Sequence, residues 1–430
     1  MIDTQGILIL LGLFLGLMMI RVPIAFSMGV ASLLTAWYLE IPVLMIFQRM
    51  VNGLNSFTFL AVPFFVVAGQ IMSEGGISDR LIALSNVIIG KIRGGLAMVN
   101  VLTSMFFGGI SGSSVADVSS IGAFLIPMMK DKGYDKDFSV AVTVTSSVQG
   151  VIIPPSQNVI YYSLAAGGVS VGRLFLGGYI PGIILGVGVM AVAYVISLIR
   201  HYPKERSYTI REALPIIADS FIGLFTFVII MGGIILGIFT ATESAAVAIV
   251  YSLLVTVFVY RTIGVSGIVR VLRNSIRTLS VIVAIIGTSS AFGFLLAYLR
   301  VPRLVTELLL GVSDSTIVII IMLNIVMIVL GMLMDMGILI LLLTPILLPV
   351  ATQIGLDPIH FGIIMMLNLG IGLCTPPVGT SLFVGCAIAD LKIEDSIKML
   401  LPFYGVMVAV LILIIAVPDI VLFLPNLFFN

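Results

Sequence analysis

The sequence predicts an all-α polytopic membrane protein whose two halves are inverted-topology repeats. Of the 430 residues, 60% are hydrophobic and 10% are charged, and the mean hydropathy is +1.26. This composition is typical of integral membrane proteins and not of soluble domains. Two proline pairs, Pro154-Pro155 and Pro376-Pro377, interrupt apolar segments in corresponding places. The basic residues are also distributed unevenly among the loops, which predicts an orientation in the bilayer.

The composition excludes several other kinds of protein. A net charge of +1 gives no reason to expect a nucleic-acid partner. Cys374 and Cys386 lie in apolar segments and indicate neither a disulfide framework nor a metal cluster. Because His201 and His360 are the two histidines of the chain, a histidine-based metal site is not expected. We therefore expect one membrane domain over residues 1–430, without a nucleotide or organic cofactor.

The first repeat covers about residues 1–200 and contains a short hairpin at about residues 95–129. Each hairpin arm has about 15 residues, or roughly 22 Å at 1.5 Å per residue. Because a spanning helix needs ~20 residues, two short arms joined by a Ser/Gly tip predict a re-entrant hairpin. The other expected elements are Ile7–Ile20, Ile24–Leu39, an amphipathic connection over Glu40–Asn55, Phe57–Met72, an interfacial Ser78–Ile89, the broken helix Phe138–Ala166 and Leu174–Ile199.

The second repeat covers about residues 212–430 and follows the same plan, with a hairpin at about residues 316–350. At a constant offset of 222 residues, Gly109 corresponds to Gly331 and Gly150 to Gly372. A register sustained over about fifty residues indicates duplication. The expected elements are Ala213–Ile238, Ala241–Tyr260, an interfacial arm over Arg261–Arg277, Leu279–Leu299, the hairpin arms Thr316–Gly331 and Met336–Val350, the broken helix Ile359–Ala389 and Leu400–Leu424.

The basic residues give an independent test of the inversion. With the segment Arg200–Arg211 in the cytoplasm, all but four of the 21 Lys and Arg residues fall on the cytoplasmic side. Lys and Arg flank the first hairpin and not the second, so the hairpins are expected to enter from opposite faces, with both chain termini in the periplasm. The exceptions are Arg49, Arg173, Arg300 and Arg303. For the last two, snorkelling at the interface and attraction of a substrate or partner stay open.

Each proline pair breaks its helix, because adjacent prolines remove two amide donors and clash with the preceding turn. The bilayer tolerates the unpaired carbonyls that result where the break is buried in protein or lines a wet cavity. Matching breaks in two halves therefore indicate the binding site of a transporter. Hydroxyls and freed carbonyls are hard oxygen ligands that suit Na⁺, and the helix N-termini at Ser156 and Thr380 can hold a carboxylate.

The candidate groups form one set at each hairpin tip. The first set contains the tip hydroxyls and two backbone positions: Ser111, Ser113, Ser114, Gly150 and Ile153. The second contains Gly331 and Asp335 of the hairpin and Gly372, Thr375 and Val378 at the break. A Ser/Gly cluster is also a common close-packing surface, and Glu243 is expected to be an N-terminal helix partner. Asp117 and Asp335 are intramembrane carboxylates, which are costly and usually functional.

Three segments resemble the large membrane subunit of tripartite ATP-independent periplasmic (TRAP) transporters: Phe107–Ser114 (FGGISGSS), Ile152–Ser156 (IIPPS) and Thr375–Gly379 (TPPVG). The similarity covers nearly the whole chain and is closest to the branch that carries sialic acid. It implies sodium coupling and an elevator mechanism, in which a region with both hairpins and both broken helices slides against a scaffold. It also implies a small four-helix membrane subunit, a soluble periplasmic binding protein and a bacterial inner-membrane location.

The resemblance further implies roles for individual residues. The first sodium site of the family maps to the Ser111–Ser114 tip and to Gly150–Pro154, which adds Ile153 and Pro154. The second maps to Gly331, Gly372, Thr375 and Val378. Substrate contacts map to Ser114, Asn158 and Asp335. Because the chain begins directly with the large subunit, the small subunit is expected to be a separate polypeptide.

The expected function is sodium-coupled symport of an organic acid, with sialic acid as the specific expectation and no enzymatic activity. A stand-alone sodium/anion permease for di- or tricarboxylates stays open, and it differs in needing no binding protein. A channel or an intramembrane enzyme is the alternative from another class. The sequence contains no P-loop motif that would suggest ATP use. An intramembrane protease would need a Ser–His or paired-Asp constellation, and neither is evident, because the histidines lie at helix ends. Saturable uptake coupled to sodium would exclude a channel.

Overall fold

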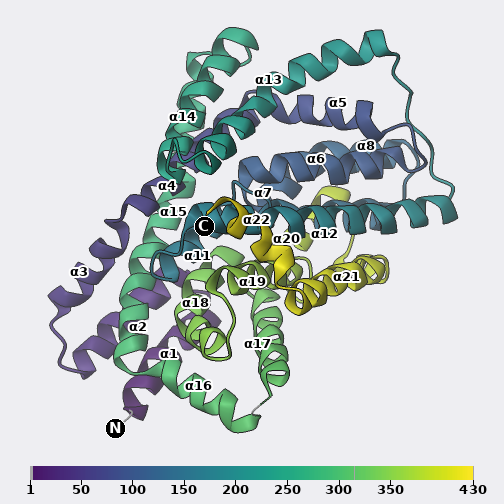
Figure 1. The fold of residues 1–430 in the computed structure, drawn as a ribbon. Helices are drawn as coiled ribbons and strands as arrows, with labels where there is room; N and C mark the ends of the chain where they lie inside the picture. Colours follow the sequence, from purple (N-terminus) through teal and green to yellow (C-terminus); the bar gives the residue numbers. More distant parts are fainter. Residues whose placement is uncertain (1–2, 314, 430) are drawn as a thin grey trace.

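The computed structural model describes residues 3–313 and 315–429, and the regular structure within them is helical (Figure 1). The first half contains α1 (Thr4–Met19), α2 (Ile24–Tyr38), α3 (Val43–Leu54), α4 (Phe57–Glu74), α5 (Ile77–Ile89), α6 (Gly95–Ser111), α7 (Ser114–Asp117), the π-helix η1 (Val118–Gly122), α8 (Ala123–Asp131), α9 (Lys136–Ser146), α10 (Gln149–Ile152), α11 (Gln157–Ala165) and α12 (Val171–Ile199). The second half contains α13 (Ile210–Ile235), α14 (Ala241–Leu254), the π-helix η2 (Val255–Val259), α15 (Val265–Tyr298), α16 (Val301–Val312), α17 (Thr316–Gly331), α18 (Met336–Gln353), α19 (Pro358–Leu373), α20 (Thr380–Ala389), α21 (Ile393–Ala416) and α22 (Asp419–Phe428).

Several helices have the length and composition of membrane spans. In the described part of the chain, seven are long and apolar enough to cross a bilayer: α4, α12, α13, α14 with η2, α15, α18 and α21. A further span consists of Lys136–Ile152 and Gln157–Ala165, which are bent by 49° at the first proline pair. The all-α polytopic class predicted from composition is therefore confirmed.

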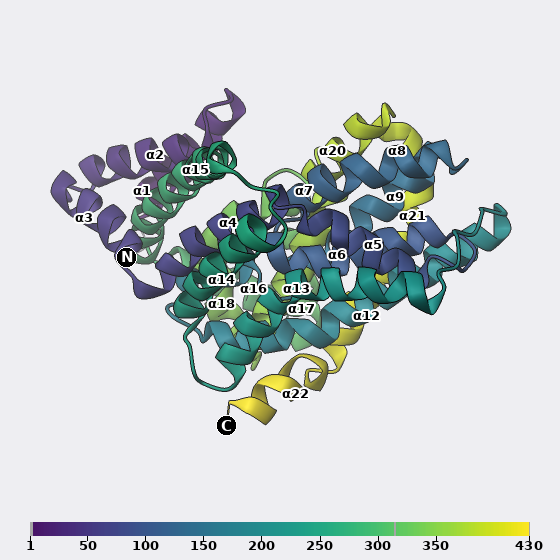
Figure 2. The same ribbon diagram turned by 90° about the horizontal axis from the view of Figure 1, so that it is seen from above.

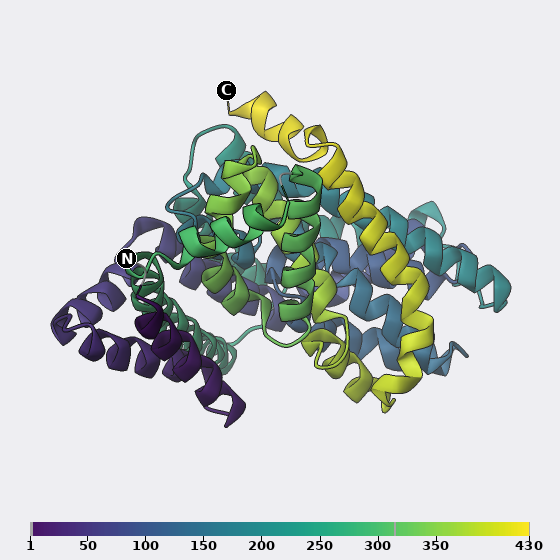
Figure 3. The ribbon, with the colours of Figure 1, turned by 90° about the horizontal axis from the view of Figure 1, so that it is seen from below.

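The helices gather into two groups (Figures 1 and 2). Helix α15 packs against α2, α3 and α4, and α4 packs against α14. Viewed from above, α1–α3 and α15 lie on one side, and α8, α9, α20 and α21 lie on the other. The view from below shows the same separation between the purple N-terminal helices and the yellow C-terminal ones (Figure 3).

One hydrophobic core runs through both groups, and α9 and α19 are buried in it on every face. Every residue of α19 from Ile359 to Leu373 is buried, as is every residue of α9 from Phe138 to Ser146. A helix that is buried all round needs apolar or internally bonded side chains on each face. Ser139, Thr143 and Thr145 meet this need, because each hydroxyl donates to a carbonyl in the preceding turn of the chain.

The structure differs from the sequence-based expectation in three elements. The expected arm Arg261–Arg277, from Val265 onward, continues into the expected helix Leu279–Leu299 as one 34-residue helix, α15, because no Gly or Pro interrupts the junction. The expected helix Leu400–Leu424 is wrong as one element: it divides into α21 and α22 at Pro418, which disfavours helical backbone at Val417. The second arm of the first hairpin is not one α-helix but α7, η1 and α8.

A polar cluster outside the spans joins the α8–α9 turn to the segment after α12. Arg200 contacts Asp135 at 2.6 Å and Asp137 at 3.2 Å, and the Tyr202 hydroxyl donates to Asp135 at 2.6 Å. The Tyr202 ring also stacks on Tyr134, with 4.4 Å between the centroids. Burial raises the pKa of Tyr202 to about 12, so its hydroxyl remains a hydrogen-bond donor at neutral pH.

Candidate sodium and substrate site

The tip of the first hairpin rests on the first broken helix. Helix α6 ends at Gly112, whose φ of 59° lies in the left-handed region that Gly adopts without strain. A Cβ at this position would lie 2.6 Å from the backbone nitrogen of Gln157, the first residue of α11. Asn158 donates from Nδ2 to the Gly112 carbonyl at 2.8 Å. Asn158, predicted to contact substrate, therefore holds the tip in this structure.

Ser114 lies at the centre of a set of buried hydroxyls. Its Oγ is 2.5 Å from that of Ser147, just after α9, and 2.7 Å from that of Ser381 on α20. Ser114, Ser147 and Ser381 are at most 1% exposed. Ser111 and Ser113 bond to each other at the tip, at 3.4 Å. The predicted site thus gains two hydroxyls that sequence reasoning missed.

A weak signal for Ser147 and Ser381 was present in the sequence. Ser147 lies three residues before Gly150, and Ser381 lies four residues after Pro377. Both are small hydroxyl residues beside a predicted break. Their convergence on Ser114 depends on tertiary packing, because Ser381 is 267 residues away along the chain.

Pairs of glycines allow each hairpin to approach its broken helix closely. A Cβ on Gly108 would lie 1.9 Å from the Cα of Gly150, and a Cβ on Gly372 would lie 2.7 Å from the Cα of Gly331. A side chain at either crossing would force the backbones apart. The glycine that meets Gly150 is Gly108, one residue before the Gly109 that the 222-residue register pairs with Gly331.

The first break runs from Ile153 to Ser156. Ile153 is extended and its side chain packs at Gly182 of α12, while the Pro154 carbonyl lies at Gly109 of the hairpin. Ser156 is fully buried, and its hydroxyl has no hydrogen-bond partner within the described structure. Such a group at the N-terminus of α11 is available to a ligand.

The second break is tied to the second hairpin by backbone bonds. The amides of Val378 and Gly379 both donate to the Met332 carbonyl, at 3.3 and 3.2 Å. The Thr375 hydroxyl donates to the Ile371 carbonyl at 2.7 Å, and the Tyr404 hydroxyl donates to the Cys374 carbonyl at 2.5 Å. Thr375 and Val378 therefore lie beside Gly331 and Gly372, as a shared site requires.

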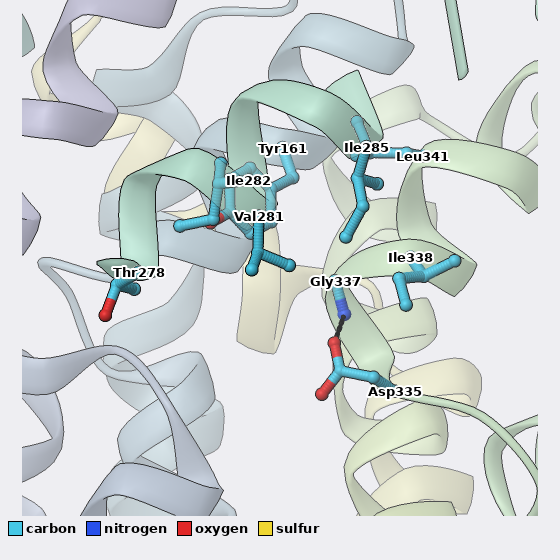
Figure 4. Close-up of a pocket in the computed structure, with 9 residues that line it drawn as sticks. All are labelled: Tyr161, Thr278, Val281, Ile282, Ile285, Asp335, Gly337, Ile338 and Leu341. Atoms are coloured by element: carbon cyan, nitrogen blue, oxygen red, sulfur yellow. Dashed lines mark hydrogen bonds between the residues drawn. The ribbon is translucent and has the colours of Figure 1, made fainter. Parts of the chain in front are cut away.

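Asp335 lies apart from the buried hydroxyls. It is the exposed N-cap of α18, and its Oδ1 accepts from the Gly337 amide at 2.9 Å (Figure 4). It borders a cavity of about 400 Å³ between α11, α15 and α18. The cavity is lined by Tyr161, Thr278, Val281, Ile282, Ile285, Asp335, Gly337, Ile338 and Leu341. Ser114 and Asn158 do not line it, so the three predicted substrate contacts do not share this cavity.

The remaining candidates have structural partners. Glu243 forms a capping box with Thr240 at the start of α14, as predicted. Arg303 pairs with Glu307 one turn along α16, at 2.7 Å. The thiol of Cys374 lies 3.3 Å from the Val144 carbonyl. Among the described residues, no three His, Cys, Asp or Glu side chains gather into a group that could hold a metal ion.

Comparisons with known proteins identify the family. Residues 11–420 match the family described as tripartite ATP-independent periplasmic transporter, DctM component. The chain is 42% identical to the uncharacterized protein YgiK of Salmonella typhimurium, over 98% of each chain. It is 36% identical to the sialic acid TRAP transporter large permease protein SiaM of Vibrio cholerae, over 89% of each chain. It is also 37% identical to the isethionate TRAP transporter permease protein DctMQ of Oleidesulfovibrio alaskensis, where it covers 66% of the relative's length.

The fold is similar to that of a solved transporter of low sequence identity. The YdaH transporter of Alcanivorax borkumensis superposes with a TM-score of 0.65 at 14% identity, covering 95% of this chain and 96% of that one. Curated relatives with a functional name are called transporter permeases and not enzymes. The chain is therefore a member of the DctM family, the large multi-pass inner-membrane permease subunits of TRAP transporters, which work with a small membrane subunit and a periplasmic binding protein.

Proposed function

We propose that this chain carries an organic acid into the cytoplasm by sodium-coupled symport, and that sialic acid is a substrate. The observation that carries the proposal is the convergence of Ser147 and Ser381 on Ser114, where a hairpin tip meets parts of both broken helices. Neutral hydroxyls beside helix breaks are suitable ligands for a partly dehydrated Na⁺. Movement of one positive charge across 100 mV supplies about 2.3 kcal/mol, which is a sufficient source of work for uphill transport.

Sodium binds at two places in this proposal. The first site uses the tip hydroxyls of Ser111, Ser113 and Ser114 with carbonyls of the Gly150–Pro154 break. The second uses Gly331 and Gly372 at their close crossing, together with Thr375 and Val378. The break carbonyls are the natural ligands, because the prolines leave them without helical amide donors.

The acid is held partly by its sodium ions and partly by the N-termini of the half-helices. Ser156 at the start of α11 has a buried unpartnered hydroxyl, and so does Thr380 at the start of α20. A helix N-terminus with a free hydroxyl favours a carboxylate. Relatives are named for sialic acid, C4-dicarboxylate, 2,3-diketo-L-gulonate and isethionate, all of which are organic anions. Asp335 then accepts hydrogen bonds from the hydroxyl groups of a sugar acid when the site faces the cavity that Asp335 borders.

We infer an elevator-type movement from the surfaces between the two helix groups. The cavity at Asp335 lies between α15 and α18, and a second cavity of about 340 Å³ lies along the same junction. Leu341 lines both cavities, so they adjoin at this side chain. A loosely filled junction favours sliding of the hairpin-bearing group against α15.

The orientation follows from the positive-inside bias, with both chain termini in the periplasm. A small four-helix membrane subunit and a periplasmic binding protein are the partners of the chain in this proposal. A stand-alone anion permease, which would need no binding protein, is the second candidate.

Reconstitution separates these candidates. The chain and its small subunit are placed in proteoliposomes, and uptake of labelled sialic acid is measured with and without the cognate binding protein. Succinate, isethionate and 2,3-diketogulonate serve as competitors. Uptake that needs the binding protein and resists the competitors supports the tripartite transporter and the substrate together. Uptake without the binding protein would favour the stand-alone permease, and inhibition by one competitor would reassign the substrate.

A further inference from the structure

The first hairpin contains a buried carboxylate that the proposed sodium and substrate sites do not use. Asp117, at the end of α7, is 1% exposed. Its carboxylate oxygens accept from no backbone amide, and Asp117 takes part in none of the ion pairs among the described residues. An ionised carboxylate inside a membrane protein needs a positive partner, because burial without one is very costly.

The groups that surround Asp117 are oxygen ligands without charge. The Ser104 hydroxyl of α6 faces the carboxylate across the hairpin and accepts from Ser146 of α9 at 3.3 Å. One turn earlier on α6, Asn100 donates from Nδ2 to Thr143 of α9 at 2.6 Å, while its Oδ1 has no partner. Ser104 and Asn100 thus form a polar strip on α6 toward α9, and the Asp117 carboxylate lies at its Ser104 end.

The backbone beside Asp117 is also irregular. The helix widens into the π-helix η1 (Val118–Gly122) directly after Asp117. Short π-helical segments are rare and occur frequently at functional sites. Gly122, the last residue of this segment, packs against Thr143. A Cβ atom on Gly122 would lie 2.9 Å from the Cγ2 atom of Thr143. The irregular segment therefore borders the same polar face as Asn100.

We propose that Asp117, with Asn100 and Ser104 on the facing helix, forms a third cation site inside the first hairpin, which binds Na⁺. A carboxylate, an amide oxygen and a hydroxyl are hard ligands that suit a small monovalent ion. The site rests on the proposed sodium coupling and deepens it, because it adds one anionic ligand to two sites made of neutral oxygens. The negative charge of Asp117 balances the positive charge of the bound ion, one helical turn from the tip that holds the substrate.

Equilibrium binding of ²²Na⁺ to the purified full-length chain tests the site. Asp117→Asn keeps the size and polarity of the side chain and removes its charge. Asp131→Asn is the matched control, because Asp131 is an exposed carboxylate at the cytoplasmic end of the same hairpin. We expect one fewer sodium ion bound per molecule in Asp117→Asn, and no change in the control. Equal numbers of bound ions in Asp117→Asn and wild type would overturn the site.

Thermal unfolding separates this inference from the proposed function. The apparent Tm of wild type should be higher in sodium chloride than in choline chloride, and this difference should shrink in Asp117→Asn and in Ser104→Ala. A Tm that responds to sodium identically in wild type and Asp117→Asn contradicts the site, even if both variants transport. Absence of sodium-driven uptake in wild type contradicts the proposed function, whereas a sodium-dependent Tm lost in Asp117→Asn would still support the cation site.

Discussion

The hydroxyl of Ser114, at the tip of the first hairpin, lies 2.7 Å from the hydroxyl of Ser381, at the start of the last half-helix. The bond joins residues 267 positions apart and lies in a fully buried environment. Ser147 approaches Ser114 from the first broken helix at 2.5 Å. A single side chain therefore links segments from both halves of the sequence, which makes Ser114 the most informative position to alter.

Replacement of Ser114 by Ala should weaken sodium coupling. The substitution removes the two buried hydrogen bonds that Ser114 makes with Ser147 and Ser381. Each loss should lower the stability of the site by about 1 kcal/mol or more. We expect the sodium concentration for half-maximal uptake to rise roughly tenfold, which corresponds to about 1.4 kcal/mol. Ser119→Ala is the control, since Ser119 is exposed and its hydroxyl donates locally to the Val115 carbonyl four residues earlier. Sodium dependence that is the same in both variants would refute the assignment.

Replacement of Thr375 by Ala should also weaken sodium dependence, with the chain still inserted in the membrane. Thr375 caps its own helix turn by donating to Ile371 at 2.7 Å, and its oxygen lone pairs remain available. Thr375→Ser keeps the hydroxyl and should behave as wild type. The measurement is the sodium titration of uptake in proteoliposomes. If Thr375→Ala and Thr375→Ser titrate together, the hydroxyl is not a ligand.

Substitution of Gly108 by Ala should disrupt the first hairpin. Its new methyl group would lie 1.9 Å from the Cα of Gly150, a contact that only backbone movement relieves. We expect a Tm lower by several degrees and loss of most uptake. Gly405→Ala in α21 is the control, because no atom lies within 4 Å of a Cβ there. It should be neutral or stabilise the helix by up to about 1 kcal/mol, and an equal effect of both substitutions would show that the crossing tolerates a side chain.

Tyr202→Phe should destabilise the polar cluster between the α8–α9 turn and the segment after α12, without changing sodium affinity. It removes the 2.6 Å bond to Asp135, worth about 1.5 kcal/mol or more because the acceptor is charged. The raised pKa of about 12 means that the protonated hydroxyl is favoured in the folded state. Its contribution is complete below the ordinary tyrosine pKa and is lost as the pH rises through the folded value. The Tm difference between variant and wild type should thus be constant at neutral pH and disappear only in strong alkali.

The sequence predicted the helix breaks well because proline acts locally. The first pair bends the chain by 49° between α10 and α11, and the second separates α19 from α20. Local chemistry of this kind can be interpreted from a single sequence. Gly150, Gly331 and Gly372 were expected at the site as ligand positions, but the close crossings of Gly150 with Gly108 and of Gly372 with Gly331 were not predicted.

Contacts between distant segments could not be predicted in the same way. Nothing in the sequence near Ser381 indicates a bond to Ser114, because that contact depends on how the two broken helices pack. The continuity of α15 was missed for a different reason. The charged residues in its first half are typical of a separate interfacial arm, but no residue at the junction interrupts the helix. Asp335 was assigned to the substrate site by resemblance, and its exposure beside a cavity depends on the position of α15.

Sodium-driven accumulation tests the central proposal most directly. Proteoliposomes with the complete transporter are loaded without sodium, and labelled substrate is followed after external sodium is added, with and without a sodium ionophore. We predict accumulation above the external concentration, which collapses when the ionophore dissipates the gradient. If the internal substrate concentration only reaches the external one, or if the ionophore does not change the uptake, sodium-coupled symport is contradicted.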